Sequence, residues 1–173
     1  MKKTVLTLMI MSIASLTFGQ QVVTKYMDKY EDDETFTKVS ISSKMFSLFT
    51  EMEGNTEDEK EFLDVISKLK GMKIVASEKV ADPKGLYNNA ISDVAKAGYE
   101  ELMTVKDAEE NVKISIKEKD GIIEELILVA GGKEKFAILS LYGIIDLKQV
   151  SKLASMMRVS ELDYLKSLDT DND

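Results

Sequence analysis

The sequence contains no cysteine, no histidine and no tryptophan among its 173 residues. Without cysteine there is no disulfide, no thiolate nucleophile and no zinc or iron–sulfur site built on cysteine. Without histidine the chain lacks an imidazole general base, a Ser-His-Asp triad and the usual ligands of zinc and copper. Because these groups are missing, the remaining catalytic chemistries depend on carboxylates, lysine, tyrosine and serine.

Positive charge is scarce as well. The chain has 23 lysine and arginine residues against 31 aspartate and glutamate residues, which gives a net charge of −8 at pH 7. An acidic surface repels nucleic acid and anionic membranes, so neither is an expected partner. Arg158 is the single arginine, which leaves little scope for bidentate phosphate binding. The simpler interpretation of the acidity is solubility alone.

Long apolar runs are missing outside the N-terminus. Lys2 and Lys3 precede an apolar stretch over residues 5–16, and small residues occupy the third and the first position before a cut between Gly19 and Gln20. This pattern is typical of a signal peptide cleaved between Gly19 and Gln20. The alternative, a membrane anchor, needs about 20 apolar residues, and this run is shorter. No cysteine is available for a lipid anchor, so we expect a soluble protein in the periplasm or outside the cell.

Several short motifs mark where helices begin and end. Residues 56–59, Thr-Glu-Asp-Glu, have the capping-box pattern, and Asp82 followed by Pro83 is a second start signal. Gly71 and Gly98 are the expected stops of these two helices. Apolar spacing predicts a further helix within residues 20–34, next to an acidic run, and another helix after Ser42 or Ser43.

The second half of the chain changes to strand patterning. Val112, Ile114 and Ile116 alternate with polar residues, which is typical of a half-buried strand. The pair Asp120-Gly121 predicts a hairpin turn. We expect Gly131-Gly132 to form the next turn, Gly143 to end the following strand, and Asp146 to cap a closing helix. Further strands are expected over residues 35–41, 72–77 and 101–106.

These elements predict one α+β domain with a mixed, mostly antiparallel sheet and helices packed on one face. The expected division of the chain is a signal peptide over residues 1–19, an N-terminal helical segment with the acidic run over 20–34, the α+β domain over 35–158 and an acidic tail over 159–173.

The carboxylates of the chain do not form a persuasive catalytic or metal site. Glu124 and Glu125 are adjacent in an expected strand, so their side chains point to opposite faces, and a solvated edge is the favoured interpretation. The Asp169-x-Asp171-x-Asp173 pattern at the end of the chain lacks the glycine and the glutamate of an EF-hand loop. The run Glu31–Glu34 offers at most loose calcium binding. No catalytic, cofactor-binding or metal-binding residue is therefore assigned.

Two further patterns have structural explanations. Residues 42–44, Ser-Ser-Lys, lack the spacing of a Ser/Lys nucleophile and fit a helix cap. The methionines that remain after cleavage are spread over helices and strands, which favours core filling over copper binding. They are Met27, Met45, Met52, Met72, Met103, Met156 and Met157.

Three segments of the chain resemble the DUF4252 family, small exported proteins of Bacteroidetes-type bacteria. They are the leader ending in Thr-Phe-Gly-Gln at residues 17–20, the strand-to-helix entry over residues 36–45, and the element over residues 141–147. The similarity extends over about residues 26–157. The family has no established activity, so the resemblance implies an exported protein and assigns no site residue. Many members are lipoproteins, but this chain has no lipobox cysteine.

The favoured function is a non-enzymatic binding module of the cell envelope, with an envelope protein or peptide as partner. The missing catalytic groups support it, as does a hairpin-rich half whose sheet edge can accept a strand. One alternative is a small-ligand carrier with an apolar cavity of several hundred Å³. The other is a hydrolase that depends on carboxylates or tyrosine. No cofactor, nucleic acid or membrane anchor is expected, and the sequence leaves the oligomeric state open.

Overall fold

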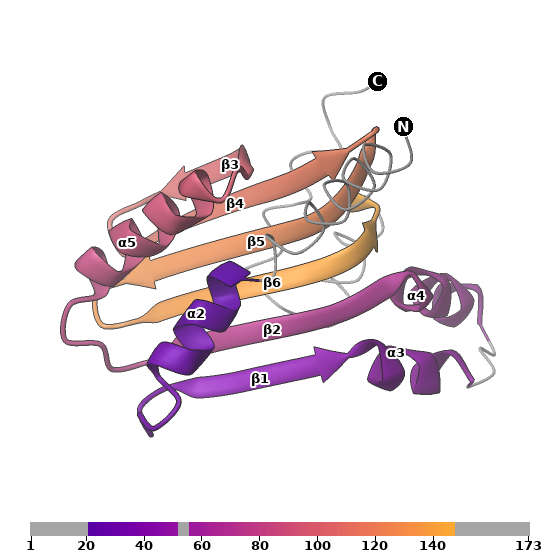
Figure 1. Cartoon of the computed structure of the whole chain (residues 1–173), viewed down its shortest axis with the longest axis horizontal. Helices are drawn as coiled ribbons and strands as arrows, with labels where there is room; N and C mark the ends of the chain where they lie inside the picture. Colours follow the sequence, from indigo (N-terminus) through magenta and orange to yellow (C-terminus); the bar gives the residue numbers. More distant parts are fainter. Residues whose placement is uncertain (1–20, 52–55, 148–173) are drawn as a thin grey trace, which may run out of the picture.

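The computed structural model describes residues 21–51 and 56–147 of the chain. In this part the core is a six-stranded sheet in the order β1-β2-β6-β5-β4-β3, and neighbouring strands are antiparallel. Helices α2 and α5 cross one face of the sheet, while α3 and α4 lie at one end of it (Figure 1). The elements are α2 (Gln21–Lys29), β1 (Thr37–Ser42), α3 (Ser43–Thr50), α4 (Glu57–Ser67), β2 (Leu69–Ser77), α5 (Pro83–Lys96), β3 (Glu100–Lys106), β4 (Glu110–Lys119), β5 (Ile122–Gly132) and β6 (Phe136–Ile145).

The α+β class and the antiparallel second half are confirmed. Strands β3 to β6 follow one another along the chain, and each pairs with the next. Between β4 and β5, Asp120 and Gly121 have φ angles of 54° and 79°. Positive φ at both central residues is what a type I′ turn requires, and this turn matches the twist of the two strands it joins.

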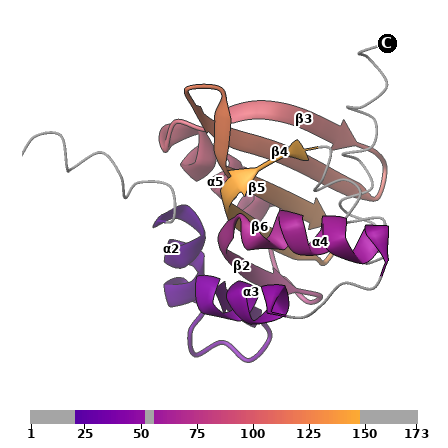
Figure 2. The same ribbon diagram turned by 90° about the vertical axis from the view of Figure 1, so that its right-hand side faces the viewer.

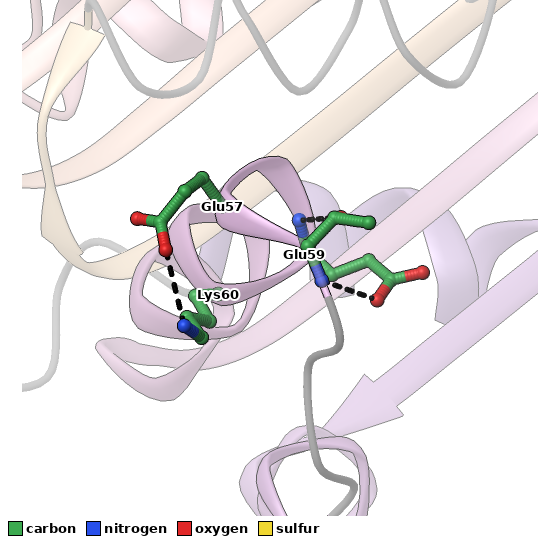
Figure 3. A network of polar contacts seen from close by, with 4 residues as sticks. Glu57, Glu59 and Lys60 are labelled. Atoms are coloured by element: carbon green, nitrogen blue, oxygen red, sulfur yellow. Dashed lines mark hydrogen bonds and ion pairs between the residues drawn. The ribbon is translucent and has the colours of Figure 1, made fainter.

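Both helix-start motifs form as the sequence predicts. The Thr56 hydroxyl accepts a hydrogen bond from the Glu59 amide at 3.1 Å, and the Glu59 carboxylate accepts one from the Thr56 amide at 3.1 Å (Figure 3). At α5 the Asp82 carboxylate accepts from the Gly85 amide at 2.8 Å, with Pro83 in the first turn. These bonds satisfy amides that have no partner within the helix.

Four glycines differ from the expectation. Gly71 does not end α4, which stops at Ser67, but lies inside β2. A Cβ atom on Gly71 would lie 2.0 Å from the hydroxyl oxygen of Tyr142, so this ring requires the glycine. Gly143 also lies within a strand, at φ 147°, and pairs with the bulged start of β2. Gly131 and Gly132 are the last residues of β5 rather than a turn.

The described helices pack against both faces of the sheet, which differs from the expected arrangement on one face. Seen from the end where α3 and α4 lie (Figure 2), α2 and α5 are on the same side of the sheet. Val23 of α2 and Ala90 of α5 are fully buried in the core of this first face. Phe46 of α3 and Ile66 of α4 belong to a separate core on the second face. A twisted antiparallel sheet with apolar residues on both sides needs cover on both.

A polar contact ties the two helices of the first face together. Asp93 of α5 accepts hydrogen bonds from the Lys25 ammonium at 2.7 Å and from the Tyr26 hydroxyl at 3.0 Å, both on α2. Burial alone would raise the pKa of Asp93, but these two donors outweigh it and hold the pKa below its usual value. The segment expected at residues 20–34 is thereby part of the main core.

Some expected features fall outside the described residues. These are the leader with its Gly19–Gln20 junction, the closing helix after Asp146, and the tail with its aspartates. Among the helices that the structure does describe, none has the length and apolar character needed to cross a membrane.

Candidate functional site

A row of three alanines crosses the second face of the sheet. Ala137 of β6 pairs with Ala76 of β2 on one side and with Ala130 of β5 on the other, so the three side chains lie next to one another. Methyl groups fill little of the space above a sheet, because the neighbouring positions carry much larger side chains. We call the resulting depression the alanine trough.

The next row of the sheet forms a taller apolar wall beside these alanines. Leu139 pairs with Ile74 and with Leu128, which places three aliphatic side chains in register across the same strands. All six residues line a cavity of about 690 Å³. That volume is within the range of ligand-binding clefts in proteins.

Charged side chains border this apolar floor at one end of the strands. The Lys135 ammonium lies 2.6 Å from the Glu78 carboxylate, and the Lys133 ammonium lies 3.3 Å from the Glu109 carboxylate. Together with the charged residues that also line the cavity, Glu110 and Glu134, the rim has more glutamates than lysines. The trough therefore combines an apolar floor with an acidic rim.

A second candidate lies on the first face, around a buried carboxylate. Glu125 of β5 is only 4 % exposed, and the Ser140 hydroxyl of β6 donates a hydrogen bond to it at 2.5 Å. The Tyr99 hydroxyl, which comes from the segment between α5 and β3, also bonds to Glu125. We call these residues, with their charged neighbours Lys73 and Lys117, the Glu125 cluster.

The sheet register explains why these groups meet. Glu125 pairs with Lys117 of β4 and with Tyr142 of β6, while Ser140 pairs with Lys73 of β2. The Lys117 ammonium lies 5.5 Å from the centre of the Tyr99 ring. The Lys73 ammonium donates to the Thr24 hydroxyl of α2 at 2.7 Å, so α2 forms part of the border of the cluster.

Burial dominates the electrostatics of this cluster. It raises the pKa of Glu125, although the hydrogen bonds from Ser140 and Tyr99 and the nearby charges of Lys117 and Lys73 act in the opposite direction. Burial and the nearby Glu125 carboxylate raise the pKa of Tyr99. The cluster therefore favours a neutral tyrosine and disfavours the charged form of the carboxyl group.

The interpretation of Glu124 and Glu125 as a solvated edge is wrong for Glu125. Strand β5 lies between β4 and β6, so it is not at an edge, and Glu125 points into the first face. Glu124 is exposed and lies at a bulge of β5, where neither neighbouring strand pairs with it. The signal in the sequence was Ser140, the single serine within the apolar run of β6, whose hydroxyl needs a polar partner when it is buried.

The acidic run near the N-terminus is organised by its own neighbours. The Lys38 ammonium donates to the backbone carbonyls of Tyr30, Glu31 and Asp33 at 2.9 to 3.1 Å. The Asp33 carboxylate accepts from the amide and the hydroxyl of Thr35, which lowers its pKa. Among the described residues, no group of three or more acidic side chains could hold a metal ion.

The remaining candidates from the sequence are the serine at the start of α3 and the methionines. Ser42 stands at the N-cap of α3 without a side-chain hydrogen bond to the helix. Met27, Met72 and Met103 are partly buried against the two cores, as core filling requires. Met45 differs, because it is 46 % exposed on α3. Met52, Met156 and Met157 lie outside the described residues.

Comparison with protein families places the chain in one of them. The family model described as a domain of unknown function, DUF4252, matches residues 30–153. The chain belongs to the DUF4252 family. The matched range includes the alanine trough and every strand of the sheet. No curated protein and no solved structure matches the chain.

Proposed function

We propose that this DUF4252 protein is a non-enzymatic binding module that holds its partner in the alanine trough. The proposal depends on the row of three alanines and the apolar wall beside it. The register of β2, β6 and β5 aligns these six side chains, and they line a cavity of about 690 Å³. An apolar hollow bordered by charged groups, as the described residues form here, is the usual form of a binding site.

The trough is a better candidate for the binding site than β3, the edge strand of the hairpin-rich half. Strand β3 carries Glu100, Glu101 and Lys106, and its pairing with β4 is irregular between Glu101 and Met103. Charged side chains and irregular pairing are the features that discourage the addition of another strand. A partner therefore gains more from the trough than from β3.

The two alternative functions have weaker support. A carrier of small apolar ligands would enclose its cargo, whereas the described residues enclose the trough only in part. A hydrolase would need a reachable carboxylate, and the Glu125 side chain is buried beneath its neighbours. Its hydrogen bonds to Ser140 and Tyr99 are explained by the need to pair a buried carboxylate.

We propose further that the protein is exported, in line with the resemblance to small proteins of Bacteroidetes-type bacteria. Two lysines and a short apolar run before Gly19 support cleavage between Gly19 and Gln20. The intact mass of the protein recovered from the periplasm or the medium tests this directly. A mass that includes residues 1–19, or protein found only in the cytoplasm, would contradict export.

The binding proposal is tested by filling the trough. Peptides selected for binding from a random display library are measured against the wild type, Ala137→Phe and Ala95→Phe. Ala137 lies in the trough, whereas Ala95 is exposed on α5 at the other face, so the second variant is a matched control. We expect Ala137→Phe to abolish binding and Ala95→Phe to leave it unchanged.

Two other results would count against the proposal. Equal binding to all three proteins would place the site elsewhere. If no peptide is selected and a fluorescent fatty acid binds the wild type but not Ala137→Phe, the carrier alternative is correct. If Ala137→Phe unfolds, Ala76→Phe, which fills the same row from β2, replaces it as the test variant.

A further inference from the structure

We infer that the partner in the alanine trough is a polypeptide segment with an apolar centre and basic residues next to that centre. This inference rests on the proposed function and adds the chemistry of the partner. It depends on two features of the same surface, the geometry of the floor and the charge of the rim.

The floor defines the apolar centre. It extends across three neighbouring strands, and strands in a sheet are about 4.8 Å apart, so its width is roughly 10 Å. That width suits two or three aliphatic side chains from one face of a peptide. Ala76, Ala130 and Ala137 leave room above them, and the wall of Ile74, Leu128 and Leu139 contacts the same side chains from the side.

The rim defines the flanking charges. Four glutamates and two lysines line the cavity, and both lysines are within ion-pair distance of a glutamate, Lys135 with Glu78 and Lys133 with Glu109. Each pair cancels one charge of each sign, so the excess charge of the rim is negative and comes from the other two glutamates, Glu110 and Glu134. The whole chain is acidic too, with a net charge of −8, so the long-range field also attracts a basic segment.

The glutamates stand on opposite sides of the floor. Glu78 follows the end of β2, whereas Glu109 and Glu110 lie at the start of β4. Glu110 begins β4 and Glu134 lies in the turn between β5 and β6, so the excess negative charge lies beside the β5 and β4 side of the floor. This arrangement fits a segment with basic residues next to its apolar centre.

The test compares two synthetic peptides with the same leucine and valine centre. One has lysine pairs at both ends, and the other has glutamate pairs. Binding to the purified protein is measured by fluorescence anisotropy or calorimetry. We expect the lysine peptide to bind about tenfold tighter or more at roughly 0.05 M salt, and the difference to shrink at about 0.5 M salt, where exposed charges are screened.

Two variants with the same change of charge locate the effect. Glu134→Lys alters the rim, and Glu118→Lys alters an exposed glutamate near the opposite end of the sheet. We expect Glu134→Lys to weaken binding of the lysine peptide about threefold or more at low salt. Glu118→Lys should change it much less, because its charge lies farther away than the screening length.

Several outcomes would overturn the inference. If both peptides bind equally at all salt concentrations and Ala137→Phe blocks both, the trough binds peptides but the basic chemistry is wrong. If neither peptide binds, both the inference and the proposed function fail. If the wild type forms a dimer that Ala137→Phe dissociates, the partner is a second copy of this chain. Binding of the lysine peptide that Ala137→Phe leaves intact would place the site elsewhere.

Discussion

The Ser140 hydroxyl donates a 2.5 Å hydrogen bond to the Glu125 carboxylate between the two central strands β6 and β5. Both side chains are almost completely buried, so neither can exchange its partner for water. A buried carboxylate destabilises the folded state when it is charged, unless hydrogen bonds and nearby cations compensate. This relationship makes the stability of the fold sensitive to the protonation of Glu125.

The first prediction concerns the pH dependence of stability. The pKa of Glu125 is raised from its ordinary value of 4.5 by burial, so the folded state favours the protonated form. Its contribution to stability is complete below pH 4.5 and is lost as pH rises through the raised pKa. Glu125→Gln keeps the shape without the charge. We expect the Tm of this variant, relative to wild type, to increase from pH 4 to pH 7 in thermal melts.

An opposite result is expected at Asp93, which serves as the control. The donors Lys25 and Tyr26 hold the pKa of Asp93 below its usual value, despite partial burial. Its contribution to stability is therefore present above the ordinary pKa of 3.8 and is lost as pH falls through the lowered value. Asp93→Asn should cost roughly 1 kcal/mol at pH 7 and less at low pH. If both variants shift the Tm in the same direction with pH, the electrostatic account is wrong.

Ser140→Ala tests the hydrogen bond itself. Removal of the hydroxyl leaves a buried carboxylate with one donor fewer, which should cost about 1–3 kcal/mol of unfolding free energy at pH 7. The cost should be smaller in the Glu125→Gln background, because a neutral amide needs less stabilisation. Denaturant unfolding of the two single variants and the double variant gives this coupling. Strictly additive losses would show that the two side chains do not act together.

The contact of Gly71 with Tyr142 predicts a steric coupling. A Cβ atom on Gly71 would lie 2.0 Å from the Tyr142 hydroxyl oxygen and 2.2 Å from Cζ, so the ring has to move. Gly71→Ala should cost roughly 1–3 kcal/mol. Addition of Tyr142→Ala should recover part of this loss, so the double variant should be more stable than the sum of the two losses predicts. No recovery would mean that the ring is not the obstacle.

The capping box of α4 allows a local prediction. Thr56→Ala removes the acceptor for the Glu59 amide and should cost about 1 kcal/mol. Thr56→Ser keeps the acceptor and should cost much less, so it serves as the matched control. Equal losses in the two variants, measured by denaturant unfolding, would show that the hydroxyl does not stabilise the helix.

Local motifs were sufficient to predict much of this fold. Asp82 with Pro83, Asp120 with Gly121, and the capping box at Thr56 each act through backbone atoms within a few residues. Their effects do not depend on the rest of the chain. The alternation in β4 is similarly local, because a strand with one buried face shows it wherever the strand lies in the sheet.

The features that the sequence did not reveal all depend on contacts between distant residues. Gly71 has the same local signature as a helix stop, and only the Tyr142 ring explains its place in β2. Glu125 is buried because β5 is central and Ser140 faces it. The alanine trough forms only when Ala76, Ala130 and Ala137 are brought into register from three strands. None of these alignments follows from spacing along the chain.

Methyl-resolved NMR with the lysine-flanked peptide tests the central claim most directly. The methyl groups of the trough, on Ala76, Ala130 and Ala137, face the second side of the sheet, whereas those of Ile127 and Ile138 face α2 and α5. We predict that the peptide shifts the alanine signals and leaves the two isoleucines unchanged. Shifts at Ile127 and Ile138 with unchanged alanines would contradict a partner site in the trough.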